Sequence, residues 1–215
     1  MKLKTIMNKK IFLILVFLFV CSLFHSAFAA NEARAIEPTH HFVFDTIPLD
    51  LKEITNSADR IFAGVCTKAK EIEKDPVSNL KVVKYTFKIT EPIKGVSKKS
   101  EITFNQWKPT TNDGGYLIRK KYVIFLYPSS SLGLTSPVGF LQGKFYVEKK
   151  GANRGVEYIR NKINNRGLTR NLRTQKRILI KGDKYLNNYI HKCSEEGKSI
   201  KYKDFVKAVR YLTSE

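Results

Sequence analysis

Residues 81–93 read KVVKYTFKITEPI and carry the clearest periodic pattern in the chain. Val83, Tyr85, Phe87 and Ile89 alternate with lysine and threonine, so one face of this segment is apolar and the other is polar. A period of two residues with one dry face is typical of a half-buried β-strand. The glycine of Lys94-Gly95 supplies a turn where the pattern stops.

The flanking sequence predicts further strands, separated by polar segments rich in turn residues. Segment 71–80, with Asp75-Pro76 and Ser78-Asn79, is predicted as a hairpin loop. Glycines within one of the segments, at 139 and 143, indicate bulges or tight curvature. Successive short strands with turns between them favour a small sandwich or barrel. The strands are expected at Arg60–Ala69, Glu101–Trp107, Lys121–Tyr127, Val138–Glu148 and Arg177–Lys181.

Apolar residues at helical spacing predict helices at both ends of this β-rich region. Leu49–Asp59 is predicted as a short helix, and a second helix carries Leu186, Ile190 and Cys193 and ends at Gly197. A third is expected from about Lys203 onward. The predicted fold class is therefore mainly β (α+β): a small antiparallel barrel or sandwich with a short N-terminal helix and one or two C-terminal helices.

The N-terminal segment has the three parts of a signal peptide. Four lysines without an acid precede an apolar run from Ile11 to Phe24, and small residues follow at Ala27 and Ala29. This order predicts cleavage after Ala29 and export across the inner membrane, to the periplasm or the outside of a bacterial cell. This run of 14 residues is short for a membrane span, which needs about 20 apolar residues.

The predicted organisation has four parts. A signal peptide occupies residues 1–29, an extended arm residues 30–48, and a barrel-like core residues 49–150. Residues 151–215 form a basic, partly helical region packed on the core, in which 151–174 is expected to be a loop or a weakly ordered hairpin. After cleavage, Cys66 and Cys193 remain. They either form a disulfide, as the oxidising compartment favours, or are two separate buried thiols.

Positive charge is concentrated toward the C-terminus. The 215 residues carry 39 Lys and Arg against 19 Asp and Glu, a net charge of +20, with enough hydrophobic residues (42%) to exclude wholesale disorder. The net charge is +4 for residues 1–29 (4 bases, no acid), +4 for 30–143 (16 and 12) and +12 for 144–215 (19 and 7). Such an excess favours an anionic partner.

A cluster of basic residues in the C-terminal third is the candidate anion-binding site. Arginine binds phosphate, sulfate or carboxylate through two parallel hydrogen bonds, and nearby tyrosines could stack on sugars or bases. The alternative is a basic surface that serves solubility. The cluster comprises Arg154, Arg160, Lys162, Arg166, Arg170, Arg173, Lys176, Arg177 and Lys181.

Residue patterns for catalysis or metal binding are weak. The sequence has no nucleophile elbow, zinc-binding helix or phosphate loop. Adjacent His40 and His41 point to opposite sides of an extended chain, so they do not form a metal site alone. The Ser129–Ser131 run lacks a recognisable base, and Asp113 before two glycines fits a turn. We therefore expect no metal and no cofactor.

Five short runs stand out in this order: SADRIFAGV (57–65), YTFKITEPIKG (85–95), YVIFLY (122–127), VGFLQGKF (138–145) and DFVKAV (204–209). Together they resemble a group of exported bacterial proteins of unassigned function that have a small netrin-like or OB-like β-barrel. The group supplies no catalytic residues. Metalloproteinase inhibitors with a similar barrel act through an N-terminal Cys-x-Cys, whereas this chain would begin at Ala30 after cleavage.

These observations predict a secreted, non-enzymatic binding module. Its basic C-terminal region would contact an anionic polymer, a membrane surface or an acidic protein. One alternative is a secreted hydrolase whose site is built from loops, and a second is an extracellular nucleic-acid binder, although export makes nucleic acid a less favoured partner.

Overall fold

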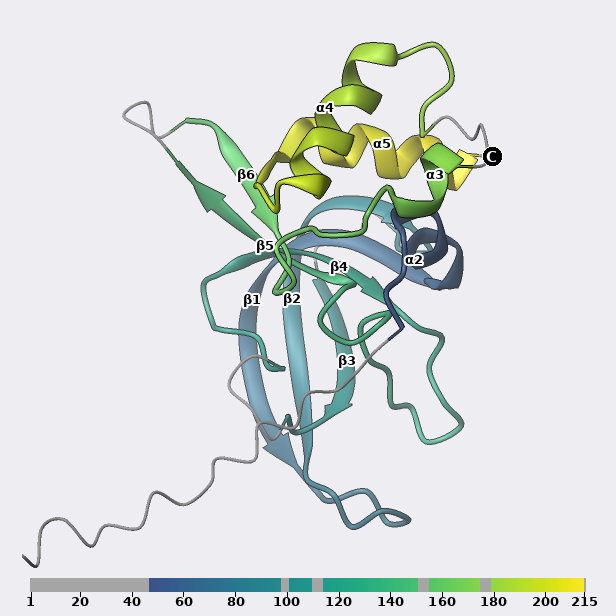
Figure 1. Ribbon diagram of the computed structural model, residues 1–215. Helices are drawn as coiled ribbons and strands as arrows, with labels where there is room; N and C mark the ends of the chain where they lie inside the picture. Colours follow the sequence, from purple (N-terminus) through teal and green to yellow (C-terminus); the bar gives the residue numbers. More distant parts are fainter. Residues whose placement is uncertain (1–46, 98–100, 110–113, 151–154, 175–178, 215) are drawn as a thin grey trace, which may run out of the picture. The chain divides into compact units, whose positions relative to one another are not determined.

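The computed structural model describes residues 47–97, 101–109, 114–150, 155–174 and 179–214, and all of them belong to one compact unit, Thr46–Glu215. The predicted signal peptide and nearly all of the predicted arm lie outside the described residues. Figure 1 shows the path of the chain. The elements in order are α2 (Leu51–Ser57), β1 (Arg60–Ile72), β2 (Val82–Lys94), β3 (Glu101–Trp107), β4 (Lys121–Leu126), β5 (Lys144–Lys149), β6 (Glu157–Arg160), α3 (Arg170–Thr174), α4 (Lys184–Glu195), β7 (Ile200–Lys201) and α5 (Tyr202–Ser214).

The strands form one antiparallel sheet in the order β3-β2-β1-β4-β5-β6-β7. The long β1–β2 pair contains three shifts of register, and such irregularities bend a strand and increase its twist. The two edge strands, β3 and β7, do not pair with each other, so the described sheet remains open. The predicted fold class, mainly β with an antiparallel sheet and terminal helices, is confirmed.

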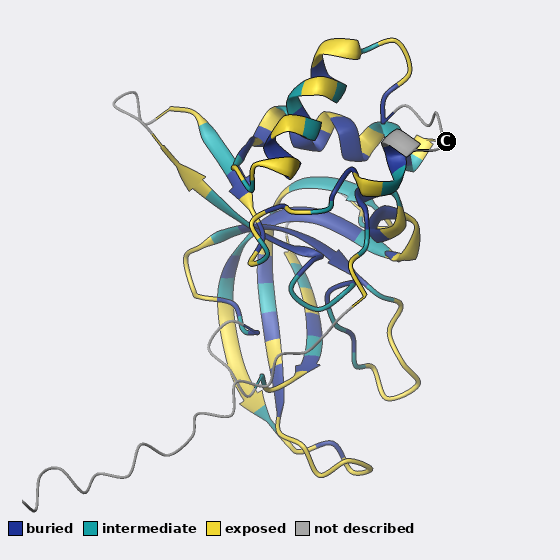
Figure 2. Cartoon of the chain, viewed as in Figure 1, coloured by how far each residue is buried: buried dark blue, intermediate teal, exposed yellow. Residues whose placement is uncertain are grey.

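Alternation along the central strands divides the core between the two faces of the sheet. In β1, Ile61 and Ala63 belong to the larger cluster, whereas Phe62 and Cys66 belong to the smaller one. Helices α2, α4 and α5 contribute to the larger cluster. Aromatic side chains dominate the smaller cluster, in which the Phe87 ring is 5.7 Å from that of Phe62. Figure 2 shows the buried residues along the strands and on the inner sides of the helices.

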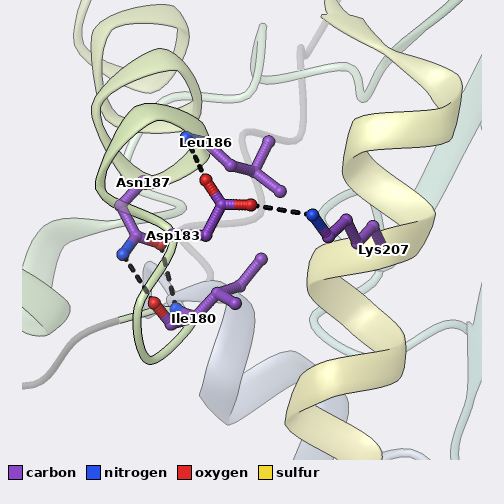
Figure 3. A network of polar contacts seen from close by, with 5 residues as sticks. All are labelled: Ile180, Asp183, Leu186, Asn187 and Lys207. Atoms are coloured by element: carbon purple, nitrogen blue, oxygen red, sulfur yellow. Dashed lines mark hydrogen bonds and ion pairs between the residues drawn. The ribbon is translucent and has the colours of Figure 1, made fainter.

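Helices α2 and α4 each begin at an aspartate cap, and one of these aspartates also contacts α5. At α2, the Asp50 side chain accepts from the Glu53 N–H, and the Glu53 carboxylate accepts from the Asp50 N–H. Two such bonds satisfy backbone donors that the first helical turn leaves open. At α4, the Asp183 carboxylate accepts from the Leu186 N–H and forms an ion pair of 2.8 Å with Lys207 of α5 (Figure 3). Asp183 thereby caps one helix and connects it to the next.

Two strand predictions are corrected by the structure. The segment predicted as Val138–Glu148 forms a strand only from Lys144, because Gly139 and Phe140 both have a positive φ near 58° and turn the chain. The described end of the Arg177–Lys181 segment is not a strand. There the N–H and C=O of Ile180 are bonded to the side chain of Asn187 (Figure 3), at 2.9 and 2.8 Å, instead of to a neighbouring strand.

The region predicted as a loop or weakly ordered hairpin, 151–174, is more regular than expected. It contains the strand β6, whose Ile159 is buried in the larger cluster, and the helix α3. β6 pairs with β5 on one side and with β7 on the other. The C-terminal third therefore continues the same sheet that the central part of the chain begins.

The possible disulfide between Cys66 and Cys193 is corrected to two free, buried thiols. The cysteines belong to different clusters: Cys66 to the aromatic one, and Cys193, on α4, to the helix-covered one. The sheet between these clusters keeps the two sulfurs apart. Burial raises the pKa of Cys66 to about 11, although hydrogen bonding with the backbone of Lys68 acts in the opposite direction.

Candidate functional site

A basic groove of about 790 Å³ is the candidate site. One wall is the turn that precedes β4, and the other is the outer half of the β5–β6 hairpin together with the turn that follows β6. The lining residues are Leu117, Lys120, Lys121, Tyr146, Val147, Glu148, Lys149, Arg160, Asn161, Lys162 and Asn164.

Cations exceed anions in this groove. Five lining residues are Lys or Arg, and Glu148 is the acid among them. Lys121 forms an ion pair of 2.7 Å with Glu157, and the other cations of the lining are Lys120, Lys149, Arg160 and Lys162. Like charges held around a recess raise its positive potential and attract anions.

One aromatic residue, Tyr146, belongs to the groove lining. In the sheet, Tyr146 pairs with Tyr122 of β4 on one side and with Arg160 of β6 on the other, so these three side chains form a row across the strands. The Nζ atom of Lys162 is 5.5 Å from the centre of the Tyr146 ring. A ring with cations beside it suits a sugar or another flat group that carries an anionic substituent.

Beside this ring, Lys144 places a positive charge inside the protein. Its side chain is wholly buried, and its Nζ donates to the Gly115 carbonyl at 2.9 Å. The same Nζ lies 5.1 Å from the ring centre of Tyr116 and 5.5 Å from that of Tyr146. The Lys144 amino group therefore lies close to both aromatic rings.

Two asparagines build the turn that presents Lys162. Asn165 is fully buried; its side chain accepts from the Asn161 N–H at 3.0 Å and donates to the carbonyls of Ile159 and Lys198. The Asn161 side chain accepts from the Asn165 N–H at 2.7 Å. Asn165 has a φ of 60°, a conformation that asparagine adopts more readily than most residues. This reciprocal pairing fixes the turn after β6.

Among the described residues, the structure places two members of the predicted basic cluster in the groove and the others elsewhere. Arg160 and Lys162 line the groove. Arg170 instead donates to the Pro48 carbonyl, and Arg166 approaches Gly197 on the other side of the turn. Lys181 is exposed shortly before α4. Arg154, Lys176, Arg177 and the side chain of Arg173 lie outside the described residues.

The sequence reasoning missed the rest of the groove. Lys120 and Lys121 belong to residues 30–143, whose net charge is only +4. Lys149 lies in the basic C-terminal part but outside the predicted cluster, and Tyr146 was predicted only as part of a strand. A local signal was present, because Arg119-Lys120-Lys121 directly precedes one predicted strand and Lys149-Lys150 follows another.

A second hollow, of about 360 Å³, lies beside α5. Its acid, Glu91 of β2, accepts from the Tyr202 hydroxyl at 2.5 Å and from Arg210 at 2.9 Å. Burial and the neighbouring Glu91 carboxylate raise the pKa of Tyr202. Because Glu91 is held by these two donors, it serves packing between β2 and α5 and is poorly placed to act as a base.

The residues considered for hydrolysis have structural contacts where they can be described. Ser129 accepts from Arg60, and Ser130 accepts from the Leu134 N–H within a turn. His191 of α4 contacts the hydroxyl of Thr169 at 2.9 Å. Asp113 and the pair His40-His41 lie outside the described residues. Within the described part of the chain, His, Cys, Asp and Glu form no group of three that could hold a metal ion.

A comparison with protein-family models finds no match, and no curated protein matches the sequence. Among the described helices, none has the length and apolar character needed to span a membrane.

Proposed function

We propose that this protein is an exported, non-enzymatic binding module that holds an anionic polymer in the groove between the turn before β4 and the β5–β6 hairpin. The observation that carries the proposal is the basic lining of this groove, in which we assign Lys120, Lys149, Arg160 and Lys162 to the ligand, with the Lys162 Nζ atom 5.5 Å from the centre of the Tyr146 ring. The ligand class is a chain that bears phosphate or sulfate esters. Export rests on the signal-peptide pattern of residues 1–29.

The geometry favours an extended ligand over a small anion. The four cations come from three separate segments: the turn before β4, the end of β5, and the end of β6 with the turn that follows. Charges spread along an open recess bind successive groups of a polymer, whereas a single small anion requires converging donors. Tyr146 and Leu117 supply apolar contact surface between the charges.

Binding of fluorescent heparin in increasing salt tests this proposal. The suitable form of the protein is Ala30–Glu215, the expected processed chain, because it contains the whole compact unit Thr46–Glu215. Affinity should fall steeply with salt, since bound cations release counterions. Replacing Arg160 and Lys162 together by glutamine removes two of the four assigned cations and should reduce the salt dependence to about half.

A matched control removes the same charge elsewhere. Lys181 and Lys184 are exposed at the start of α4, and their replacement by glutamine should leave heparin affinity within about twofold of the parent. Equal losses in both double variants would show that net charge, and not the groove, causes binding. Absence of salt-sensitive binding in the parent would refute the proposal altogether.

A further inference from the structure

The turn before β4 exposes two consecutive aliphatic side chains at the edge of the basic groove. Leu117 is 62% exposed and Ile118 is 52% exposed. Leu117 also lines the groove, and the exposed Arg119 and Lys120 follow directly in the sequence. Large aliphatic side chains directly beside several cations are typical of surfaces that enter the interface of an anionic membrane.

The exposure of these side chains is fixed by the surrounding structure. The preceding Tyr116 is buried in the aromatic cluster, with its ring 4.8 Å from that of Tyr85 and 5.3 Å from that of Tyr122. The Leu117 N–H donates to the Tyr122 hydroxyl at 2.8 Å, and the Arg119 N–H donates to the Cys66 carbonyl at 2.8 Å. The turn is thus attached to the sheet on both sides of the exposed pair.

Charge distinguishes this turn from another exposed apolar site, at the tip of the β1–β2 hairpin. There Val77 is 80% exposed, but the loop 71–80 carries three acids against one lysine, Lys74, and the nearby Lys81 and Lys108 are both paired with Glu71. The turn before β4 instead borders a groove in which cations exceed acids. An anionic surface therefore complements the turn better than it complements the hairpin tip.

We propose that the groove and this turn together dock on an anionic lipid bilayer. Lipid phosphates would occupy the basic groove, and Leu117 and Ile118 would enter the interface between head groups and acyl chains. The proposal rests on the anion-binding function above and names the source of the anion as a membrane surface. Half-exposed aliphatic side chains gain free energy when they leave water, and the nearby cations add electrostatic attraction.

Vesicle sedimentation with Ala30–Glu215 tests the proposal, because this form lacks the apolar run of residues 11–24. We expect binding to vesicles of phosphatidylcholine mixed with phosphatidylglycerol, and little binding to phosphatidylcholine alone. Replacing Leu117 and Ile118 together by serine should lower vesicle affinity at least about tenfold. Ile118→Ser alone changes no residue of the groove lining, so it should lower vesicle affinity about threefold while leaving heparin affinity unchanged. Both side chains are exposed, so folding should be retained, as thermal unfolding can verify.

The control replaces Val77 and Leu80, at the hairpin tip, by serine and should retain vesicle binding. Vesicle binding that is unaffected by the Leu117 and Ile118 substitutions, or equally reduced in the control, would overturn the docking proposal. Heparin binding without vesicle binding would also overturn it, identify a soluble polymer as the ligand and leave the proposed function intact. Failure to bind either probe would refute the proposed function itself.

Discussion

Replacement of Asn165 tests how the groove is built. In the structure, the Asn165 side chain makes three hydrogen bonds, of 3.0 Å to the Asn161 N–H, 3.2 Å to the Ile159 carbonyl and 2.9 Å to the Lys198 carbonyl. Each such bond contributes about 1 kcal/mol net, so Asn165→Gly should lower the free energy of unfolding by about 3 kcal/mol. Glycine retains the positive φ, whereas Asn165→Ala should cost about 1 kcal/mol more.

Urea unfolding followed by circular dichroism measures these differences. The neighbouring Asn164 has a φ of 58° but an exposed side chain, so Asn164→Gly should remain within about 0.5 kcal/mol of the parent. Because the Asn161–Asn165 pairing holds the turn that carries Lys162, Asn165→Gly should also weaken heparin binding by a few-fold while folded. If Asn165→Gly unfolds with the free energy of the parent, the pairing does not stabilise the turn, and this account of the groove is wrong.

Other regions of the fold yield further expectations. Phe205→Ala removes a fully buried ring 4.6 Å from that of Phe145, and should lower the free energy of unfolding by about 3–5 kcal/mol in the same assay. Tyr202→Phe removes the hydroxyl bonded to Glu91 and should cost about 1–2 kcal/mol; an unchanged midpoint would show that Arg210 alone satisfies this carboxylate. Burial raises the pKa of Cys66 to about 11, whereas an unfolded thiol ionises near 9. Folding therefore favours the neutral thiol. The free energy of unfolding should fall by up to about 2–3 kcal/mol as pH rises from about 9 to 11, and it should fall by less in Cys66→Ala. Native thiols should react slowly with a disulfide reagent at neutral pH and rapidly in denaturant; protection that persists in denaturant would indicate a disulfide.

Elements with a local pattern could be predicted from the sequence. The alternation from Val83 to Ile89 identified β2, and the spacing of Phe205, Val209 and Leu212 identified α5, because burial of one face repeats with the period of the backbone. The strand prediction for Arg177–Lys181 failed because a side chain takes the place of a neighbouring strand as the hydrogen-bond partner of the backbone. At Ile180, hydrogen bonds from Asn187 occupy the backbone groups that a strand would use, and no local apolar pattern reports such a contact.

The groove depends on strand register, which the sequence did not provide. Lys121 pairs with Val147, and Tyr146 pairs with Arg160, so residues from both sides of the predicted boundary at 150 line one recess. Counted along the chain, +12 of the +16 that remains after residues 1–29 lies in residues 144–215. Counted in space, the cations of the groove come from both parts of the chain. Residues that are far apart in the sequence become neighbours when long connections join adjacent strands, as between β4 and β5.

Because the groove combines residues from both parts of the chain, an experiment that locates the binding site must leave the fold intact. A chain ended at Ala152 would remove the basic C-terminal third, but it would also remove β6, β7, α4 and α5. The larger cluster would then lose buried residues such as Ile159, Ile190 and Phe205, and apolar surface on the sheet would be exposed. Loss of binding in such a chain would report unfolding and not charge. Paired substitutions on opposite walls, Lys120→Gln and Arg160→Gln, leave the core intact. Because both cations are assigned to one recess, the double variant should lose more affinity than either single change, and an effect from one wall alone would place the ligand outside the groove.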